Sequence, residues 1–375
     1  DGSPANLVLT SSNTGQLVHN DEILNVTGVD DWQSGGPPTT VLANASWTII
    51  INANIGDTLQ LGNATSPASG ILAKVVVNNS LSSVTIDDTA TTTAGSVYTI
   101  DRAQAPDYAI TGPGINFTTA AAAIAADGIT LLTAPDTPIV NVLSTSAAGS
   151  EPVTVDLGAT EAGVINVGNA GSLAGIHSAL TAKATGGTGT LNLDGSAETS
   201  EQTFTVSGTT VTGGSLGAPV DYSDAGIDVL GITGGSDNDH FNVTIPSSSN
   251  ISTFNLDGGP GTDVLTLHTT RTGVNFSTPG LIVFNPSSIN VNYTNCETVN
   301  LSKAATPVVG TSRTIDATVV SPFTQAVAAS FTNDDPTTNA SSFIASIDWG
   351  DGTPTTAGQI VANGLTSYDV LGGHT

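Results

Sequence analysis

The chain has 375 residues, enough for two or three domains or one long repeat array, and its 32 acidic and 6 basic residues give a net charge of −26. With so few Lys and Arg residues to displace counterions from phosphates, nucleic acids and anionic membranes are poor candidate partners, and cations are favoured. Hydrophobic residues make up 38% of the chain and fall in short β-branched runs. We therefore expect an all-β protein with many thin strands and no membrane insertion.

Residues 1–80 are the first predicted region, an N-terminal β region whose fold the pattern does not define. Alternating apolar and polar residues predict strands at 5–10 and 48–52. The chain contains no methionine, so we expect it to be a processed or excised product. A processed N-terminal segment of this kind is free to reach out toward another molecule.

A hydrophobic-Asn-hydrophobic triplet recurs through the second predicted region, residues 81–302. Three successive triplets are centred on Asn141, Asn166 and Asn192, about 25 positions apart, and a later one is centred on Asn290. On a strand, the two apolar neighbours face one side and the Asn faces the other. The near-constant spacing predicts stacked coils that share one core, as in a parallel β-helix-like repeat region.

Longer segments of this region repeat as well. The segments 97–100 and 115–118 match 203–206 and 220–223, and the last of these returns at 291–294. These matches predict roughly two copies of a unit of about 100 residues, each made of several coils. Tyr222 and Tyr293 occupy matching positions, and we expect both to be buried in similar coils.

Two glycine-rich turns carry the sharpest chemical signal. Residues 258–266 fit the G-G-x-G-x-D-x-U-x pattern at every fixed position, and residues 234–242 fit it except that Asp237 replaces the third glycine. Glycines let carbonyl oxygens turn toward a cation, and Asp supplies a carboxylate. Because Asp239 and Asp263 hold equivalent positions about one coil apart, we expect Ca²⁺ to be bound by them with help from Asp237, Asp257 and glycine carbonyls. The alternative is a metal-free turn in which Asp accepts backbone N–H groups.

On these turns and on segments 141–146 and 167–176, the region resembles RTX-like β-strand-repeat proteins of bacterial surfaces. The resemblance implies a parallel β-helix, calcium-binding turns and an extracellular or cell-surface location. The turn at 158–164 departs from the RTX pattern, as do most of the other turns, which places calcium at those coils in doubt.

Residues 308–375 form the third predicted region. Residues 347–353 and 368–375 resemble the W-G-D-G and H-T-Y signatures of polycystic-kidney-disease (PKD) domains, small immunoglobulin-like β-sandwiches of extracellular proteins. Because the sequence stops at Thr375, we expect the sandwich to lack its last strand and to leave an apolar edge open. Residues 1–16 of a neighbouring subunit are the predicted strand donor, which gives a head-to-tail homopolymer.

The sequence as a whole predicts a secreted structural protein, a calcium-stabilised subunit of an extracellular filament, sheath or surface layer (S-layer), that is not an enzyme. One alternative is a carbohydrate-binding or adhesin module with surface polysaccharide as its partner, and another is a polysaccharide lyase-like β-helix enzyme. Basic residues are scattered singly, which disfavours the lyase-like enzyme. The lone Cys296 excludes an internal disulfide, and its expected role is that of a small buried residue.

Overall fold

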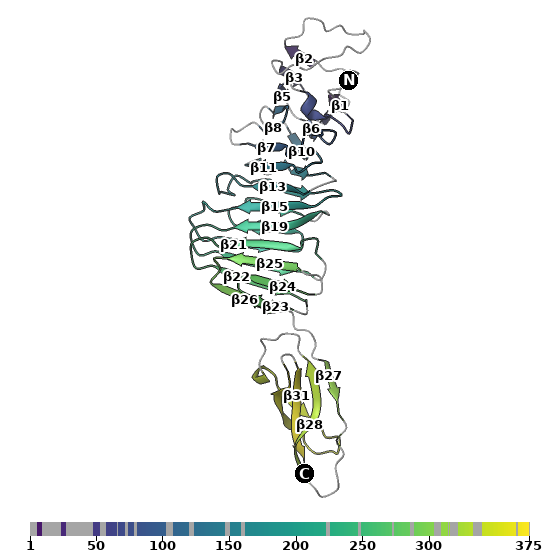
Figure 1. Ribbon diagram of the computed structural model, residues 1–375, viewed down its shortest axis with the longest axis vertical. Helices are drawn as coiled ribbons and strands as arrows, with labels where there is room; N and C mark the ends of the chain where they lie inside the picture. The colour runs from purple at the N-terminus through teal and green to yellow at the C-terminus, as the bar shows by residue number, and fades with distance from the viewer. Residues whose placement is uncertain are drawn as a thin grey trace.

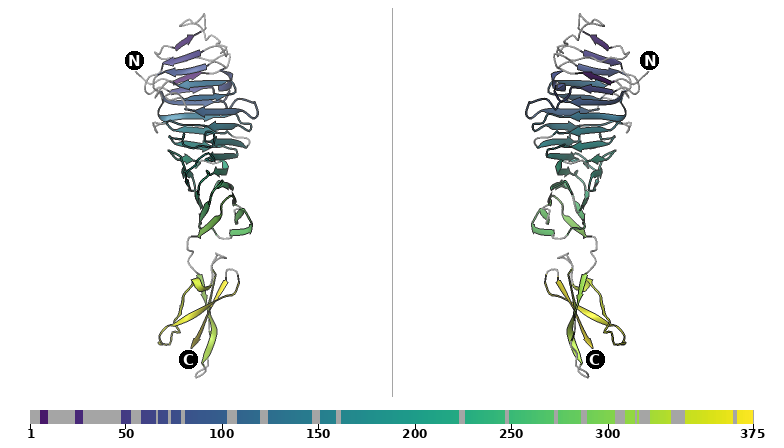
Figure 2. Two further views of the ribbon diagram at one scale, coloured as in Figure 1. Left: turned by 90° about the vertical axis from the view of Figure 1, so that its left-hand side faces the viewer. Right: turned by 90° about the vertical axis from the view of Figure 1, so that its right-hand side faces the viewer.

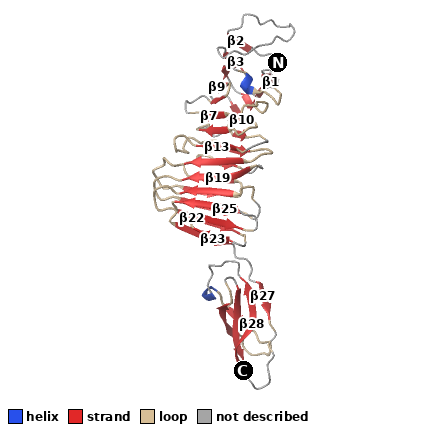
Figure 3. Cartoon of the chain, viewed as in Figure 1, coloured by secondary structure: helices blue, strands red, loops and turns tan. Residues whose placement is uncertain are grey.

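The computed structural model shows an all-β protein in which a two-sheeted parallel β-helix-like solenoid precedes a small antiparallel unit (Figure 1). The helical elements of the described part are two short 3-10 helices, η1 (Ala68–Gly70) and η2 (Ala340–Ser342) (Figure 3). The structure describes residues 6–9, 24–27, 48–52, 58–65, 67–71, 74–78, 81–102, 108–119, 124–146, 151–158, 162–222, 226–246, 249–271, 274–285, 289–303, 309–313, 315, 322–332, 340–364 and 367–374.

Two sheets with mostly parallel neighbours form the solenoid. In spatial order, the twelve strands of sheet A are β1 (Asn6–Leu9), β4 (Thr58–Leu61), β6 (Leu81–Asp87), β10 (Ile124–Leu132), β12 (Val153–Asp156), β14 (Leu180–Lys183), β18 (Val220–Asp221), β17 (Thr210–Gly213), β16 (Thr203–Val206), β20 (His240–Ile245), β22 (Val264–Thr269) and β26 (Thr298–Lys303). The fourteen strands of sheet B, again in spatial order, are β2 (Leu24–Thr27), β3 (Thr48–Asn52), β5 (Lys74–Asn78), β9 (Ile115–Thr119), β8 (Ala109–Gly112), β7 (Val97–Asp101), β11 (Ile139–Val142), β13 (Gly163–Val167), β15 (Gly189–Asp194), β19 (Ile227–Thr233), β21 (Thr253–Asp257), β25 (Ile289–Thr294), β24 (Leu281–Phe284) and β23 (Val274–Thr278).

The coils stack along the long axis of the solenoid, as Figure 2 shows from two sides. Through the register of β11, β13 and β15, Asn141 lies beside Asn166, which lies beside Asn192. The predicted stacking of these three triplets is therefore confirmed. The triplet centred on Asn290 is displaced by two residues, because Asn292 is the residue that lies beside Asn255 in the same outward row.

A single hydrophobic core runs from Leu59 to Val291 and takes its side chains from both sheets. Strand alternation explains it. In β15, Leu191 and Leu193 are at most 1% exposed, while Asn192 between them faces outward. Burial of each such aliphatic side chain stabilises the fold by about 1.5–3 kcal/mol.

Three antiparallel meanders interrupt the parallel stacking: β7-β8-β9 in sheet B, β16-β17-β18 in sheet A and β23-β24-β25 in sheet B. In each meander the third strand returns to the preceding coil, since β9 pairs with β5, β18 with β14 and β25 with β21. The first strands of the first two meanders continue to the next coil, β7 pairing with β11 and β16 with β20. The repeated sequence segments lie at these first and third strands.

The meanders correct the expectation that Tyr222 and Tyr293 are buried alike. Each tyrosine N–H donates to the carbonyl of the residue just before the middle strand of its meander. Tyr222 N–H donates to Thr209, before β17, at 2.8 Å, and Tyr293 N–H donates to Gly280, before β24, at 2.9 Å. Their topological roles match, but Tyr222 follows a strand of sheet A and Tyr293 lies in sheet B. Tyr222 is 2% exposed and Tyr293 is only partly buried.

The described N-terminal strands continue the same two sheets. β1 pairs in parallel with β4 in sheet A, and β2 pairs with β3 in sheet B. The predicted boundary near residue 80 stays a prediction, although strands on both sides of it share these sheets. Of the predicted donor segment, residues 1–5 and 10–16 lie outside the described residues, and the described part, β1, is paired within its own chain.

The C-terminal unit is a five-stranded antiparallel sheet C in the spatial order β27 (Val309–Ser312), β28 (Phe323–Thr332), β31 (Ser367–His374), β30 (Thr356–Ala362) and β29 (Ala345–Ile347). It has its own core around Phe331, Ile347, Tyr368 and Val370. The last strand, β31, lies between β28 and β30, so both of its edges are occupied. The predicted sandwich that lacks its last strand stays a prediction, and the edges of this sheet among the described residues are β27 and β29.

The unequal burial of the two tyrosines gives a test of the meander assignment. We expect Tyr222→Ala to lower the free energy of unfolding by about 3–5 kcal/mol because it empties a fully packed position. Tyr293→Ala is expected to cost less than half as much, because this ring is partly exposed. Urea unfolding of both variants measures the difference, and equal losses would contradict the assignment.

Candidate functional site

The two glycine-rich turns lie in successive coils and connect sheet B to sheet A. The turn at 234–239 leads from β19 to β20, and the turn at 258–263 leads from β21 to β22. At the first glycine of each turn, the space of a side chain is already filled. A Cβ on Gly234 would lie 2.4 Å from Asp239 Oδ2 and 2.7 Å from the Gly258 carbonyl oxygen. A Cβ on Gly258 would lie 2.6 Å from Asp263 Oδ2 and 2.1 Å from the Asn295 carbonyl oxygen.

The second glycine of each turn lets consecutive coils approach each other. A Cβ on Gly259, whose φ is +84°, would lie 2.2 Å from the Gly235 carbonyl oxygen. A Cβ on Gly235 would lie 2.3 Å from the Glu198 carbonyl oxygen of the preceding turn. Backbone atoms cannot move aside cheaply, so the spacing between coils itself requires glycine at these positions.

A stack of four polar side chains, which we call the carboxylate column, lies beside these glycines. Its members are Gln202, Asp239, Asp263 and Glu297, each of which directly precedes a strand of sheet A. Each carboxylate accepts the backbone N–H of the preceding member. The distances are 2.7 Å from Gln202 N to Asp239 Oδ1, 2.6 Å from Asp239 N to Asp263 Oδ1 and 2.7 Å from Asp263 N to Glu297 Oε2.

Asp239 and Asp263 use their second oxygens differently, although both residues are 0% exposed. Asp239 Oδ2 accepts a hydrogen bond from Gly235 N–H at 2.5 Å, so both of its oxygens bind the backbone. Asp263 Oδ2 is buried and has no hydrogen-bond partner. Burial raises the pKa of Asp263, and the negative charges of Asp239, Glu297 and Asp257 add to the shift, against the hydrogen bond from Asp239 N–H.

The other two predicted ligands lie at different places in the turns. Asp257 Oδ1 accepts hydrogen bonds from Gly259 N–H at 3.1 Å and from Asn295 Nδ2 at 2.7 Å. Asp237 is exposed, and its Oδ1 accepts the N–H of Asn238 at 2.9 Å. Within the described part of the chain, no group of three or more His, Cys, Asp or Glu side chains has the arrangement of a metal site.

Two oxygens beside Gly258 are of the kinds that Ca²⁺ binds, fewer than the roughly six to eight ligands of a complete calcium site. The unpartnered Asp263 Oδ2 and the Asn295 carbonyl oxygen both lie against Gly258, and oxygen ligands of these two kinds are those that Ca²⁺ prefers. Asp239 has no oxygen without a backbone partner. Calcium at Asp237, Asp239, Asp257 and Asp263 stays a prediction. The alternative was a metal-free turn in which Asp accepts backbone N–H groups, and both Asp239 and Asp263 accept such groups.

Sequence reasoning missed Gln202, Glu297 and Glu198. The turns before β16 and β26 lack the double-glycine pattern, so nothing marked Gln202 and Glu297 as continuing the column. Glu198 Oε1 accepts hydrogen bonds from the hydroxyls of Ser172 and Ser215, both at 2.7 Å. Although burial opposes the shift, these hydroxyls and the N–H of Leu173 lower the pKa of Glu198. Glu198 thereby joins turns of neighbouring coils.

Cys296 lies next to the column, directly before Glu297. It is half-buried against the core. Burial, reinforced by the charges of Asp263 and Glu297, raises the pKa of the Cys296 thiol to about 12. A thiol with this pKa carries almost no thiolate at neutral pH and is a poor nucleophile.

No protein-family model, curated protein or solved structure matches the chain. Within the described residues, no helix is both long and apolar enough to span a membrane. The site must therefore be interpreted from its own geometry.

The carboxylate column predicts unequal effects for two neighbouring aspartates. Asp239→Ala leaves the buried N–H groups of Gln202 and Gly235 without acceptors, so we expect it to lower the free energy of unfolding by about 2–4 kcal/mol even with excess chelator. Asp237→Ala changes an exposed side chain and is expected to cost less than about 0.5 kcal/mol. Chemical denaturation in chelator measures both, and a tolerated Asp239→Ala would contradict the role of the column.

Proposed function

We propose that the protein is a secreted structural protein, a calcium-stabilised subunit that polymerises head to tail into an extracellular filament, sheath or surface layer. The observation that carries this proposal is an edge strand of the C-terminal unit that pairs on one side only among the described residues. β29 is an edge strand of sheet C, and Ile344 directly before it is 100% exposed. Unpaired edges are templates for strand pairing.

Edge strands also occur at the far end of the solenoid. In the described part of the chain, β1 ends sheet A and β2 ends sheet B, near the top of Figure 1, while the C-terminal unit lies beyond the opposite end. A contact between two unlike ends of identical subunits is heterologous, and it yields a filament when its rotation does not close into a ring. Donation of residues 1–16 is one form of this contact, and it requires β1 to leave its pairing with β4.

Calcium is proposed as the stabilising ion on the strength of the second turn. A cation at Asp263 Oδ2 would neutralise a buried carboxylate that lies close to the charges of Asp239, Glu297 and Asp257. Binding to the folded state alone stabilises that state by linkage. The predicted calcium ligands Asp237 and Asp257 remain part of this proposal.

The proposed resemblance to a PKD domain is supported by one cluster of signature residues. The ring of Trp349 stacks on that of His374 with a centroid distance of 4.9 Å, and His374 Nε2 lies 2.8 Å from Asp351 Oδ2. Trp349 Nε1 donates to Thr356 Oγ1 at 2.9 Å. The resemblance to RTX-like proteins rests on the double-glycine turns, and the absence of enzymatic activity remains a prediction.

Electron microscopy of the purified chain tests the assembly directly. We expect filaments or sheets in calcium, their loss in excess chelator, and their loss in Ile344→Lys, which places a charge at the apolar edge. Because Ile344 is fully exposed, this variant should melt like wild type. Val97→Lys is the matched control, since Val97 is 48% exposed on sheet B, and it should assemble normally. Monodisperse wild-type monomers in calcium would sink the proposal.

A further inference from the structure

An asparagine ladder runs across the outer face of sheet B. Asn166 Nδ2 donates to Asn141 Oδ1 and Asn192 Nδ2 donates to Asn166 Oδ1, both at 3.1 Å. Further along the same row, Asn292 Nδ2 donates to Asn255 Oδ1 at 2.8 Å. Every amide therefore points the same way, nitrogen toward the preceding coil and oxygen toward the next.

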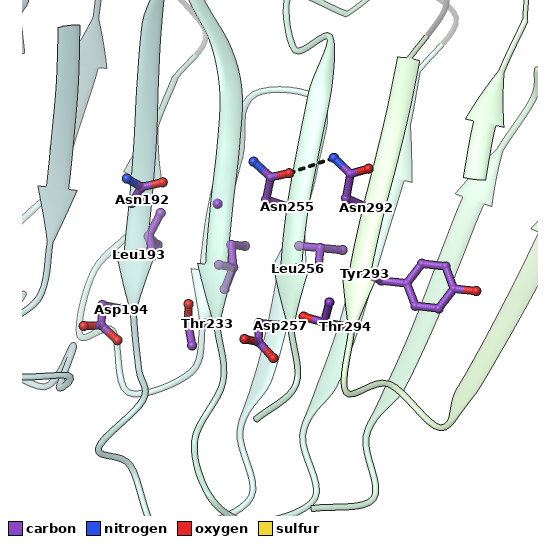
Figure 4. Close-up of a pocket in the computed structure, with 12 residues that line it drawn as sticks. Asn192, Leu193, Asp194, Thr233, Asn255, Leu256, Asp257, Asn292, Tyr293 and Thr294 are labelled. Carbon is purple, nitrogen blue, oxygen red and sulfur yellow. Dashed lines mark hydrogen bonds between the residues drawn. The ribbon is translucent and has the colours of Figure 1, made fainter. Parts of the chain in front are cut away.

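Gly231 interrupts this ladder. It lies between Asn192 and Asn255 in the register of β15, β19 and β21, so one rung has no amide. Figure 4 shows the oxygen of Asn192 on the side toward Asn255 and the nitrogen of Asn255 on the side toward Asn192. Gly231 lies between them in the strand register. Among the described residues no hydrogen bond reaches either of these two atoms. The two asparagines are two strand spacings apart, about 9.5 Å.

A groove of about 350 Å³ covers this interruption and extends to the next outward row. In that row Asp194 lies beside Thr233, which lies beside Asp257. Both carboxylates use Oδ1 to accept hydrogen bonds, Asp194 from Ser196 N–H and Asp257 from Gly259 N–H and Asn295 Nδ2. The carboxylates of Asp194 and Asp257 and the Thr233 hydroxyl thus form a second polar row, about 6.6 Å along the strands from the amide gap.

A ligand that fills the gap needs one hydrogen-bond donor for Asn192 Oδ1 and one acceptor for Asn255 Nδ2. A trans secondary amide has its N–H and C=O pointing in opposite directions. Placed over Gly231, it donates to Asn192 Oδ1 and accepts from Asn255 Nδ2, which restores the ladder. Hydroxyl groups next to that amide would donate to the carboxylates of Asp194 and Asp257, and such bonds to charged acceptors are strong. These carboxylates repel anionic ligands.

We propose that the groove over Gly231 binds a neutral N-acetylated sugar, with the acetamido group in the amide gap and ring hydroxyls on Asp194, Thr233 and Asp257. Its volume lies in the range of small-ligand sites. This site is separate from the sheet edges of the assembly proposed above, because it lies on the face of sheet B, but it shares Asp257 with the proposed calcium ligands. It gives the protein a contact with a polysaccharide that carries N-acetylhexosamine units.

Isothermal titration calorimetry of the full chain with N,N′-diacetylchitobiose tests the site. We expect saturable binding, with binding of cellobiose, which has the hydroxyls without the acetamido groups, at least about tenfold weaker. Gly231→Asn supplies the missing rung and should weaken chitobiose binding by at least about tenfold without lowering the melting temperature. The Cβ it adds meets only the flexible end of Asn192, 2.6 Å away.

Two further variants keep the test decisive if Gly231→Asn folds poorly. Asn255→Ala removes the donor at the gap from an exposed position and should lose binding. Asn141→Ala removes the amide at the far end of the ladder, which bonds to neither asparagine of the gap, and should bind as wild type does. No binding of chitobiose, equal binding of cellobiose, or unchanged binding by Asn255→Ala would overturn the proposal. Equal binding of N-acetylglycine N′-methylamide, which has amides but no hydroxyls, would assign the gap to a peptide instead of a sugar.

Discussion

The backbone ladder between coils is the constraint on which this structure depends. Each parallel strand of the solenoid must return at one strand spacing, about 4.8 Å, from the coil before it. Turns held this close leave no room for side chains at Gly234, Gly235, Gly258 and Gly259. The same closeness buries backbone N–H groups that need acceptors, and the carboxylate column supplies them. Close coil spacing therefore requires glycine, and buried backbone N–H groups require an acidic side chain, whether or not a metal is bound.

The meanders add local antiparallel structure without breaking the solenoid. A three-stranded meander widens one sheet by two strands while the other sheet advances by one, and successive meanders fall in sheet B, sheet A and sheet B. Because extra strands in one sheet are followed by extra strands in the other, the two sheets keep similar numbers of strands, twelve in sheet A and fourteen in sheet B. It also explains why related sequence segments occur on opposite sheets.

Much of the fold follows from local sequence, because strand alternation and coil spacing are local properties. The triplets at Asn141, Asn166 and Asn192 predicted both the outward row and its register. The triplet centred on Asn290 predicted the wrong residue for the outward row, because β25 takes its register from its two neighbours, β24 and β21. The double glycines located Asp239 and Asp263, whereas Glu297 has no such mark. The gap at Gly231 arises only when three strands distant in sequence are aligned, so sequence spacing does not reveal it.

Amide hydrogen exchange resolved by NMR tests most directly the claim that carboxylates of one coil hold the backbone of the preceding coil. We predict slow exchange of the Gln202, Asp239 and Asp263 N–H groups in excess chelator. In Asp263→Ala we predict that exchange accelerates selectively at Asp239, whose N–H donates to the removed carboxylate. Fast exchange at Asp239 in the wild-type chain, or protection that survives the substitution, would contradict the claim.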